Sequence, residues 1–166
     1  MRSALALFAV FLTTITHAGA AVIGGPLLRD GLEIVPSILS GVELDRSPVP
    51  ESRGPDAVFL VADIRAAKDE AHGFSGFIPY LSVSYALTKD DAPTFKKSGL
   101  LYPVAAKDGP HYGAAAALAG PGTYHLTYIV SPPISHGMLR RTDHAGGVPD
   151  WWKPITVSFA FKYPQK

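Results

Sequence analysis

Histidines are the side chains of this 166-residue sequence most suited to chemistry, because imidazole can act as a general base or as a metal ligand. The sequence contains no cysteine, which excludes thiolate metal sites, disulfides and a cysteine nucleophile. It also lacks the G-x-S-x-G, H-E-x-x-H, P-loop and Rossmann signatures of common enzymes. Metal binding is therefore the first chemistry to consider, and five histidines follow the first twenty residues: His72, His111, His125, His136 and His144.

One of these histidines lies in a distinctive stretch, Asp108-Gly109-Pro110-His111-Tyr112-Gly113. The Gly-Pro pair predicts a loop directly after a strand, and such a turn holds a side chain in place at little entropic cost. Asp108 is near enough to donate an oxygen to a metal, or to orient the imidazole through a hydrogen bond. Because a transition metal needs about three or four donors, His111 and Asp108 are candidate ligands that need further partners.

The remaining histidines are weaker candidates for a metal site. We expect His72 to be exposed in a polar connection, and His125 to face solvent or make a hydrogen bond from a strand. His136 and His144 lie between residues 131 and 149, in a segment containing Gly and Pro that could bend back towards His111.

Several short segments that could position these residues alternate apolar and polar side chains, as strands with one buried face do. The clearest are Tyr80 to Leu87, Gly122 to Val130 and Ile155 to Tyr163. The apolar run from Ala57 to Ile64 suits a strand covered on both faces, and Leu100 to Ala105 is a further short strand.

Less regular segments complete the prediction. Residues 21 to 31 look like an arm, Glu33 to Leu44 like an edge strand, and Lys89 to Gly99 like a turn-rich link. The only helical alternative is Gly113 to Ala119, whose alanines favour a helix of barely two turns. Fifteen prolines and sixteen glycines argue against long helices, so we predict an all-β fold: an antiparallel sandwich of about seven or more strands.

The first twenty residues have the three parts of a secretory signal peptide: Arg2, an apolar run from Leu5 to Thr16, and the cleavage motif Ala18-Gly19-Ala20. Cleavage would leave one domain, residues 21–166, and export without disulfides favours a bacterial periplasm. No other segment is long enough to span a membrane, so we expect no membrane insertion after cleavage. Without Arg2, 14 basic residues balance 14 acidic ones, which offers no footprint for nucleic acid.

Several motifs occur together in this order: PYLSVSYAL, DGPHYG, GTYHLTYIVSPP and TDHAGGVPDWWKPITVSFAFKY. In this combination the sequence resembles the bacterial periplasmic Fe²⁺ transport protein family, from about Leu32 to Tyr163. Those are small exported copper- and iron-binding proteins that work beside an inner-membrane iron permease. The resemblance implies an immunoglobulin-like β-sandwich, a homodimer with metal sites near the subunit interface, and copper or iron as the bound ion.

The family's metal ligands are only partly retained here. In the family the site draws on a histidine and a glutamate of an H-x-E-A-D-I-H strand, a methionine, the DGPHYG histidine and the histidine of R-H-x-D. His111 matches, with Asp108 and Asp63 as retained carboxylates. Groups that cannot coordinate a metal fill the other four positions: Phe59, Val61, Val104 and Arg141.

These substitutions leave several hypotheses open. The leading one is a non-enzymatic accessory protein of iron uptake whose metal site is dismantled, with Asp63, Asp108, His111 and Asp143 as remaining candidates. A second is a rearranged copper site in which His144 or Met138 compensates beside His111. A third is a structural module that pairs with a metal-competent relative through the apolar run from Phe59 to Val61. A hydrolytic enzyme is the least supported, since it needs a nucleophile and base within hydrogen-bond reach.

Overall fold

The computed structural model of the chain describes residues 21–46, 54–68 and 72–164. The predicted signal peptide, residues 1–20, lies outside the described residues. The described part contains one short 3₁₀ helix, η1 (Pro133–His136), and no helix long and apolar enough to cross a membrane. Its strands are β1 (Ala21–Val22), β2 (Leu27–Arg29), β3 (Leu32–Leu39), β4 (Ala57–Ala66), β5 (Ser82–Lys89), β6 (Lys96–Ala106), β7 (Gly109–Ala117), β8 (Gly122–Ser131) and β9 (Ile155–Tyr163).

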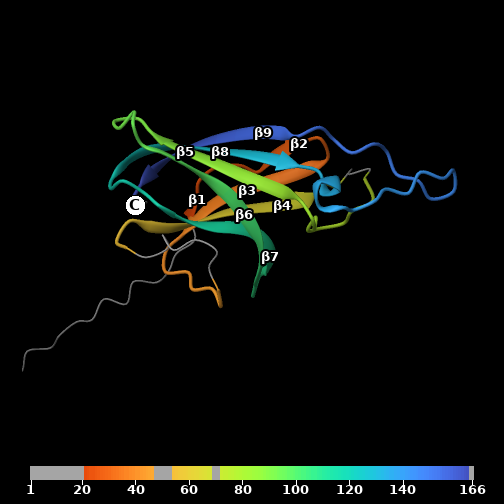
Figure 1. The fold of residues 1–166 in the computed structure, drawn as a ribbon, viewed down its shortest axis with the longest axis horizontal. Coiled ribbons are helices and arrows are strands. Elements are labelled where there is room, and N and C mark those ends of the chain that lie inside the picture. Colours follow the sequence, from red (N-terminus) through yellow and green to blue (C-terminus); the bar gives the residue numbers. More distant parts are fainter. Residues whose placement is uncertain (1–20, 47–53, 69–71, 165–166) are drawn as a thin grey trace, which may run out of the picture.

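The strands form two antiparallel layers that share one strand (Figure 1). One layer has the order β1-β3-β4-β7-β6, with β2 also paired to β3, and the other has the order β6-β5-β8-β9. The first half of β6 pairs with β5 up to Leu101, and its second half pairs with β7 from Tyr102. The predicted antiparallel β-sandwich is confirmed, and β6 is the strand that changes sheet.

The core lies between the layers and follows the alternation in the sequence. On β8 every second side chain is fully buried, at Tyr124, Leu126, Tyr128 and Val130. β9 runs from Ile155 to Tyr163, as the alternation predicted. Leu60, Ala62 and Ile64 of β4 face the same core from the other layer. An antiparallel sheet buries one face against its partner, so these alternating sets become the interior.

The DGPHYG stretch is a hairpin rather than a loop, which corrects one prediction. The chain turns at Lys107 and Asp108, and Gly109 to Ala117 forms β7, so His111 is a strand residue. The helical alternative at Gly113 to Ala119 is wrong as well. Pairing with β4 on one side and β6 on the other satisfies the backbone of this alanine-rich segment, and this outweighs its helix propensity.

Two further segments are more ordered than predicted. The link from Lys89 to Gly99 ends early, because β6 already begins at Lys96. The arm of residues 21–31 contributes β1 and β2, which both pair with β3. Local sequence underestimates such strands because their pairing partners are distant in the chain.

Buried tyrosines attach the site-bearing strands to the rest of the sandwich. The Tyr112 hydroxyl donates to the carbonyl of Ile78 at 2.8 Å and accepts from the backbone N–H of Leu81 at 3.0 Å. Tyr128 donates to the carbonyl of Val61 at 3.1 Å. Burial raises the pKa of both phenols, so both remain hydrogen-bond donors at neutral pH.

Candidate functional site

The outer face of the β4–β7–β6 sheet gathers most of the positions identified in the sequence. Since Leu60 and Ala62 face the core, Phe59 and Val61 project from the opposite face of β4. Val61 pairs with Gly113 of β7, and His111 of β7 pairs with Val104 of β6. Three strands thus bring the one retained histidine together with three of the four substituted family positions.

Apolar side chains fill this part of the face. The Phe59 ring lies over Gly113, so close that a methyl group there would collide with its Cε1 and Cζ atoms. The same ring meets the His111 imidazole edge-on, with centroids 6.5 Å apart. Phe59 and Val61 are only 4% and 5% exposed although they lie on the outer side of the sheet. The surroundings of His111 therefore offer hydrocarbon where a metal would need donor atoms.

Asp63, the retained carboxylate of β4, is paired with Arg65 on the same strand face. The Arg65 Nε lies 2.9 Å from Oδ1 and 3.0 Å from Oδ2 of Asp63. The register that pairs Ala62 with Tyr112 places Asp63 next along β4, towards His111. Arg65 was not predicted as a site residue, although its i, i+2 spacing from Asp63 on a strand was a usable signal. A cation approaching Asp63 would meet a guanidinium that is always protonated.

The other candidates are not gathered around His111. Asp108 is exposed in the turn between β6 and β7. Arg141 and Asp143 form an exposed pair in the segment 137–150, with Nη2 2.9 Å from Oδ1, and this pairing lowers the pKa of the Asp143 carboxyl. His144 is exposed and Met138 half-buried in the same segment. Figure 1 shows this segment, in blue, projecting from the sandwich well away from the β6–β7 hairpin, so one chain does not assemble the rearranged site.

The remaining histidines have other environments. His125 Nε2 lies 2.6 Å from Asp90 Oδ1 on the surface, as the hydrogen-bond prediction anticipated. His72 was predicted to be exposed, which is wrong: it is half-buried, with its ring centroid 5.0 Å from that of Trp152. The tryptophan pair of the GV-x-x-WW-x-P motif, distant in sequence, covers it. His136 is exposed at the end of η1.

The described part of one chain does not gather a complete set of metal donors on this face. Within residues 21–46, 54–68 and 72–164, no three His, Cys, Asp or Glu side chains are placed to share a metal. His111 supplies one imidazole, whereas a transition-metal site needs about three or four donors. Arg65 and the apolar neighbours of His111 further disfavour a cation, because repulsion between positive charges grows as water is excluded.

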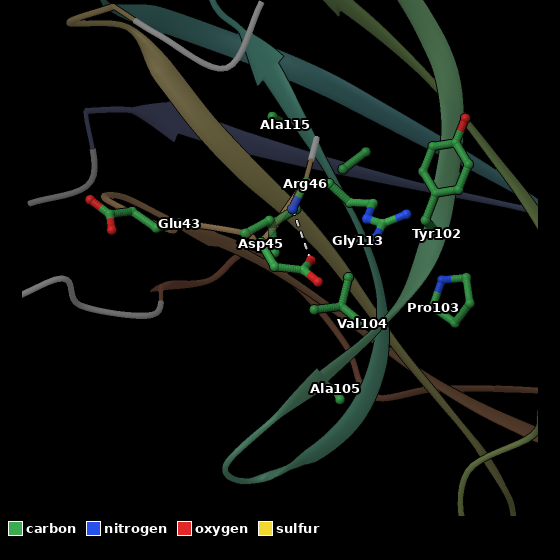
Figure 2. Close-up of a pocket in the computed structure, with 11 residues that line it drawn as sticks. Glu43, Asp45, Arg46, Tyr102, Pro103, Val104, Ala105, Gly113 and Ala115 are labelled. Carbon is green, nitrogen blue, oxygen red and sulfur yellow. Dashed lines mark hydrogen bonds between the residues drawn. The ribbon is translucent and has the colours of Figure 1, made fainter. Parts of the chain in front are cut away.

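A pocket of about 640 Å³, lined in part by Val104 and Gly113, lies on this face of the sheet (Figure 2). Residues 43–46, which follow β3, form one side of it, and β6 and β7 form the other. The pocket was not predicted, because no local motif marks a cavity between segments so far apart in sequence. Its lining comprises Glu43, Leu44, Asp45, Arg46, Tyr102, Pro103, Val104, Ala105, Gly113, Ala114 and Ala115.

Comparison with known proteins agrees with the resemblance drawn from the motifs. A UPF0423 protein of Brucella abortus is 40% identical over 146 residues, covering 85% of this chain and 80% of that protein. A copper-bound variant of FetP from uropathogenic Escherichia coli strain F11 shares 37% identity at a TM-score of 0.80, covering 88% of this chain and 98% of FetP. Copper-reconstituted P19 from Campylobacter jejuni shares 36% identity at a TM-score of 0.80, covering 88% of this chain and 97% of P19. The model of the Fe²⁺ transport protein family matches residues 17–164, and the chain therefore belongs to that family.

Proposed function

We propose that this chain is a non-enzymatic periplasmic protein of iron uptake, accessory to an inner-membrane iron permease, whose metal site has been dismantled. Its family membership supports the iron-uptake role. The signal-like first twenty residues support export, and FetP was expressed in the periplasm for its structure. In this proposal metal binding is weak, altered or lost.

The observation that carries the proposal is the apolar cluster around His111. FetP and P19 have been solved with copper bound, so this protein scaffold can hold the metal. In this chain Phe59, Val61 and Val104 contact or pair with His111 and Gly113. Removing one ligand from a site weakens it, whereas replacing several with hydrocarbon leaves too few donors to hold the ion.

Titration calorimetry with Cu²⁺ tests the dismantled site. The mature wild-type protein is expected to show no stoichiometric sub-micromolar site. A restored variant carrying Phe59→His, Val61→Glu, Val104→Met and Arg141→His is expected to gain one, and adding His111→Ala to that variant should remove it. Circular dichroism verifies that each protein is folded, and tight one-to-one binding by the wild type would overturn the proposal.

Genetic complementation tests the role in iron uptake separately from the metal site. Deleting the gene is expected to slow growth of the source bacterium under iron chelation. If the site is unused, a His111→Ala gene will restore growth as well as the wild-type gene does. Normal growth of the deletion strain contradicts the iron-uptake role, while failure of the His111→Ala gene alone contradicts only the dismantled site.

We further infer a homodimer, as the family resemblance implies. Segment 137–150, which carries Arg141, lies away from the β6–β7 hairpin of its own chain (Figure 1), so only a partner chain could bring Arg141 to this hairpin. Light scattering on the purified protein is expected to give twice the mass of one chain. The alternative of pairing with a metal-competent relative is weaker, because Phe59, Leu60 and Val61 are buried within the chain and cannot supply the contact.

A further inference from the structure

The two layers of the sandwich end in very different edge strands. The layer that carries His111 ends in β1 and β2, which have two and three residues and are separated by Gly24-Gly25-Pro26. Short, interrupted strands of this kind offer little backbone to another chain. The other layer ends in β9, which has nine residues and lies farthest from the shared strand β6 (Figure 1). The β9 edge is therefore long enough to pair with a further strand.

β9 has none of the features that usually protect an edge strand. Its pairing with β8 is unbroken from Ile155 to Tyr163, so no bulge twists the edge away. The strand contains no proline, and its one charged residue is Lys162, near its end. In the part of the chain that the structure describes, the backbone hydrogen bonds formed outside the sheet ladders do not involve residues 155–161. A row of backbone N–H and C=O groups along the free side of β9 is thus available to another strand.

The apolar side of β9 is complementary to itself in the antiparallel direction. When two copies of the strand are aligned about a two-fold axis at Phe159, that ring faces its counterpart in the second copy. The remaining apolar positions then pair as Ile155 with Tyr163 and Val157 with Phe161. Pairs of a β-branched and an aromatic side chain are among the favourable contacts between strands. Phe159 and Tyr163 are only half-buried in one chain, so this alignment covers apolar surface that otherwise contacts water.

The solvent-facing side of β9 brings no like charges together in this alignment. Thr156, Ser158 and Ala160 are exposed and uncharged. Ser158 faces Ala160 of the second copy, and Lys162 faces Thr156. The two lysines therefore lie at opposite ends of the paired strands, about 20 Å apart along the strand direction. A charge near the centre of the strand would repel the same charge in a second copy, and β9 has none there.

We propose that β9 is an interaction surface for β9 of a second copy of this chain, and that the pair joins the β6-β5-β8-β9 layers of two chains into one continuous antiparallel sheet. This surface lies in the layer that does not carry His111, so it is separate from the homodimer contact inferred above and links such dimers to one another. The inference goes beyond the proposed role in iron uptake.

The size of the β9 edge sets the strength of the contact. Nine residues span about 30 Å and two packed sheets about 10 Å, which gives roughly 300 Å² on each copy. Interfaces of this size are weak, so we expect a dissociation constant of about 0.1–1 mM. The contact is therefore a concentration-dependent one, added to whatever assembly the chain forms in dilute solution.

A charge-swap experiment on the mature protein tests the contact and its register. Sedimentation velocity from about 10 μM to about 1 mM is expected to show the wild-type mass doubling as concentration rises. Ser158→Lys combined with Ala160→Lys places like charges opposite each other and should raise the dissociation constant at least about tenfold. Ser158→Glu combined with Ala160→Glu should do the same. An equimolar mixture of the two double variants is expected to associate again, because each lysine then faces a glutamate.

A matched variant and a second measurement test the location. Ser84→Lys combined with Ala86→Lys makes the same change on the same face of the sheet, but in β5, two strands from the edge. It should associate as the wild type does, and circular dichroism verifies that every variant is folded. In NMR spectra of the wild type, the amide shifts that change with concentration should lie in residues 155–163 and the adjoining part of β8.

The proposal is overturned by any of four results. These are no doubling of mass with concentration, association that survives the double lysine substitution in β9, a mixture that fails to associate, and shifts that lie elsewhere in the chain. The mass at the lowest concentration reports on the homodimer by itself, so failure of the β9 contact leaves that inference and the iron-uptake role untouched.

Discussion

The substitution Gly113→Ala tests whether the Phe59 ring is fixed beside His111. Gly113 does not have a left-handed φ, so the backbone itself accepts alanine, and this substitution would ordinarily stabilise a strand by about 0.4–1 kcal/mol. In this chain the added methyl would overlap the Phe59 ring. The two effects have opposite signs, so even the direction of the result is informative.

We expect the steric effect to prevail. Phe59 is 4% exposed, so its ring cannot move into solvent, and overpacking of this kind costs roughly 1–3 kcal/mol. A net loss of about 2 kcal/mol corresponds to a melting temperature lower by roughly 4–8 °C for a domain of this size. Urea unfolding followed by the fluorescence of Trp151 and Trp152 measures the change in the free energy of unfolding.

A double-mutant cycle identifies the ring as the cause. In a Phe59→Leu background the space above Gly113 is partly vacated, so Gly113→Ala should change stability by less than about 0.5 kcal/mol, and the coupling free energy should be about 1–3 kcal/mol. Phe159→Leu is the matched control background, because Phe159 packs against Gly24 rather than Gly113. A neutral or stabilising Gly113→Ala, or an equal cost in all three backgrounds, would refute the view that the Phe59 ring is fixed over Gly113.

Three further predictions concern hydrogen bonding and titration. Tyr112→Phe removes a buried hydroxyl with two backbone partners and should lower the free energy of unfolding by about 1–3 kcal/mol in urea denaturation. Burial raises the pKa of Tyr128, so the folded state retains a proton that the unfolded chain releases at high pH. The free energy of unfolding should therefore fall above about pH 10, by up to about 1.4 kcal/mol per pH unit for this group. In Tyr128→Phe it should fall less steeply. The Asp143 carboxyl has its pKa lowered by Arg141, so its contribution to stability is present above its unfolded pKa and is lost as pH falls through the folded value. In NMR titration Arg141→Ala should raise that pKa towards its ordinary value, whereas an unchanged pKa would contradict the pairing.

The sequence by itself was sufficient for the all-β sandwich, because side-chain direction in a strand has a period of two and the alternation on β8 and β9 repeats it residue by residue. The order of the motifs was sufficient to identify the family. The residue types at Phe59, Val61, Val104 and Arg141 already indicated that four of the family's metal ligands are missing. Predictions that depended on local propensity alone, the DGPHYG loop and the alanine-rich helix, were wrong.

Only the tertiary structure decided what those residues do together. Register between β4, β7 and β6 placed Phe59 over Gly113 and beside His111. Chain folding also set the segment 137–150 away from the β6–β7 hairpin. Contacts between residues 40 or more positions apart depend on strand pairing rather than on spacing in the sequence, which is why a list of candidate ligands could not become a site until the sheets were formed.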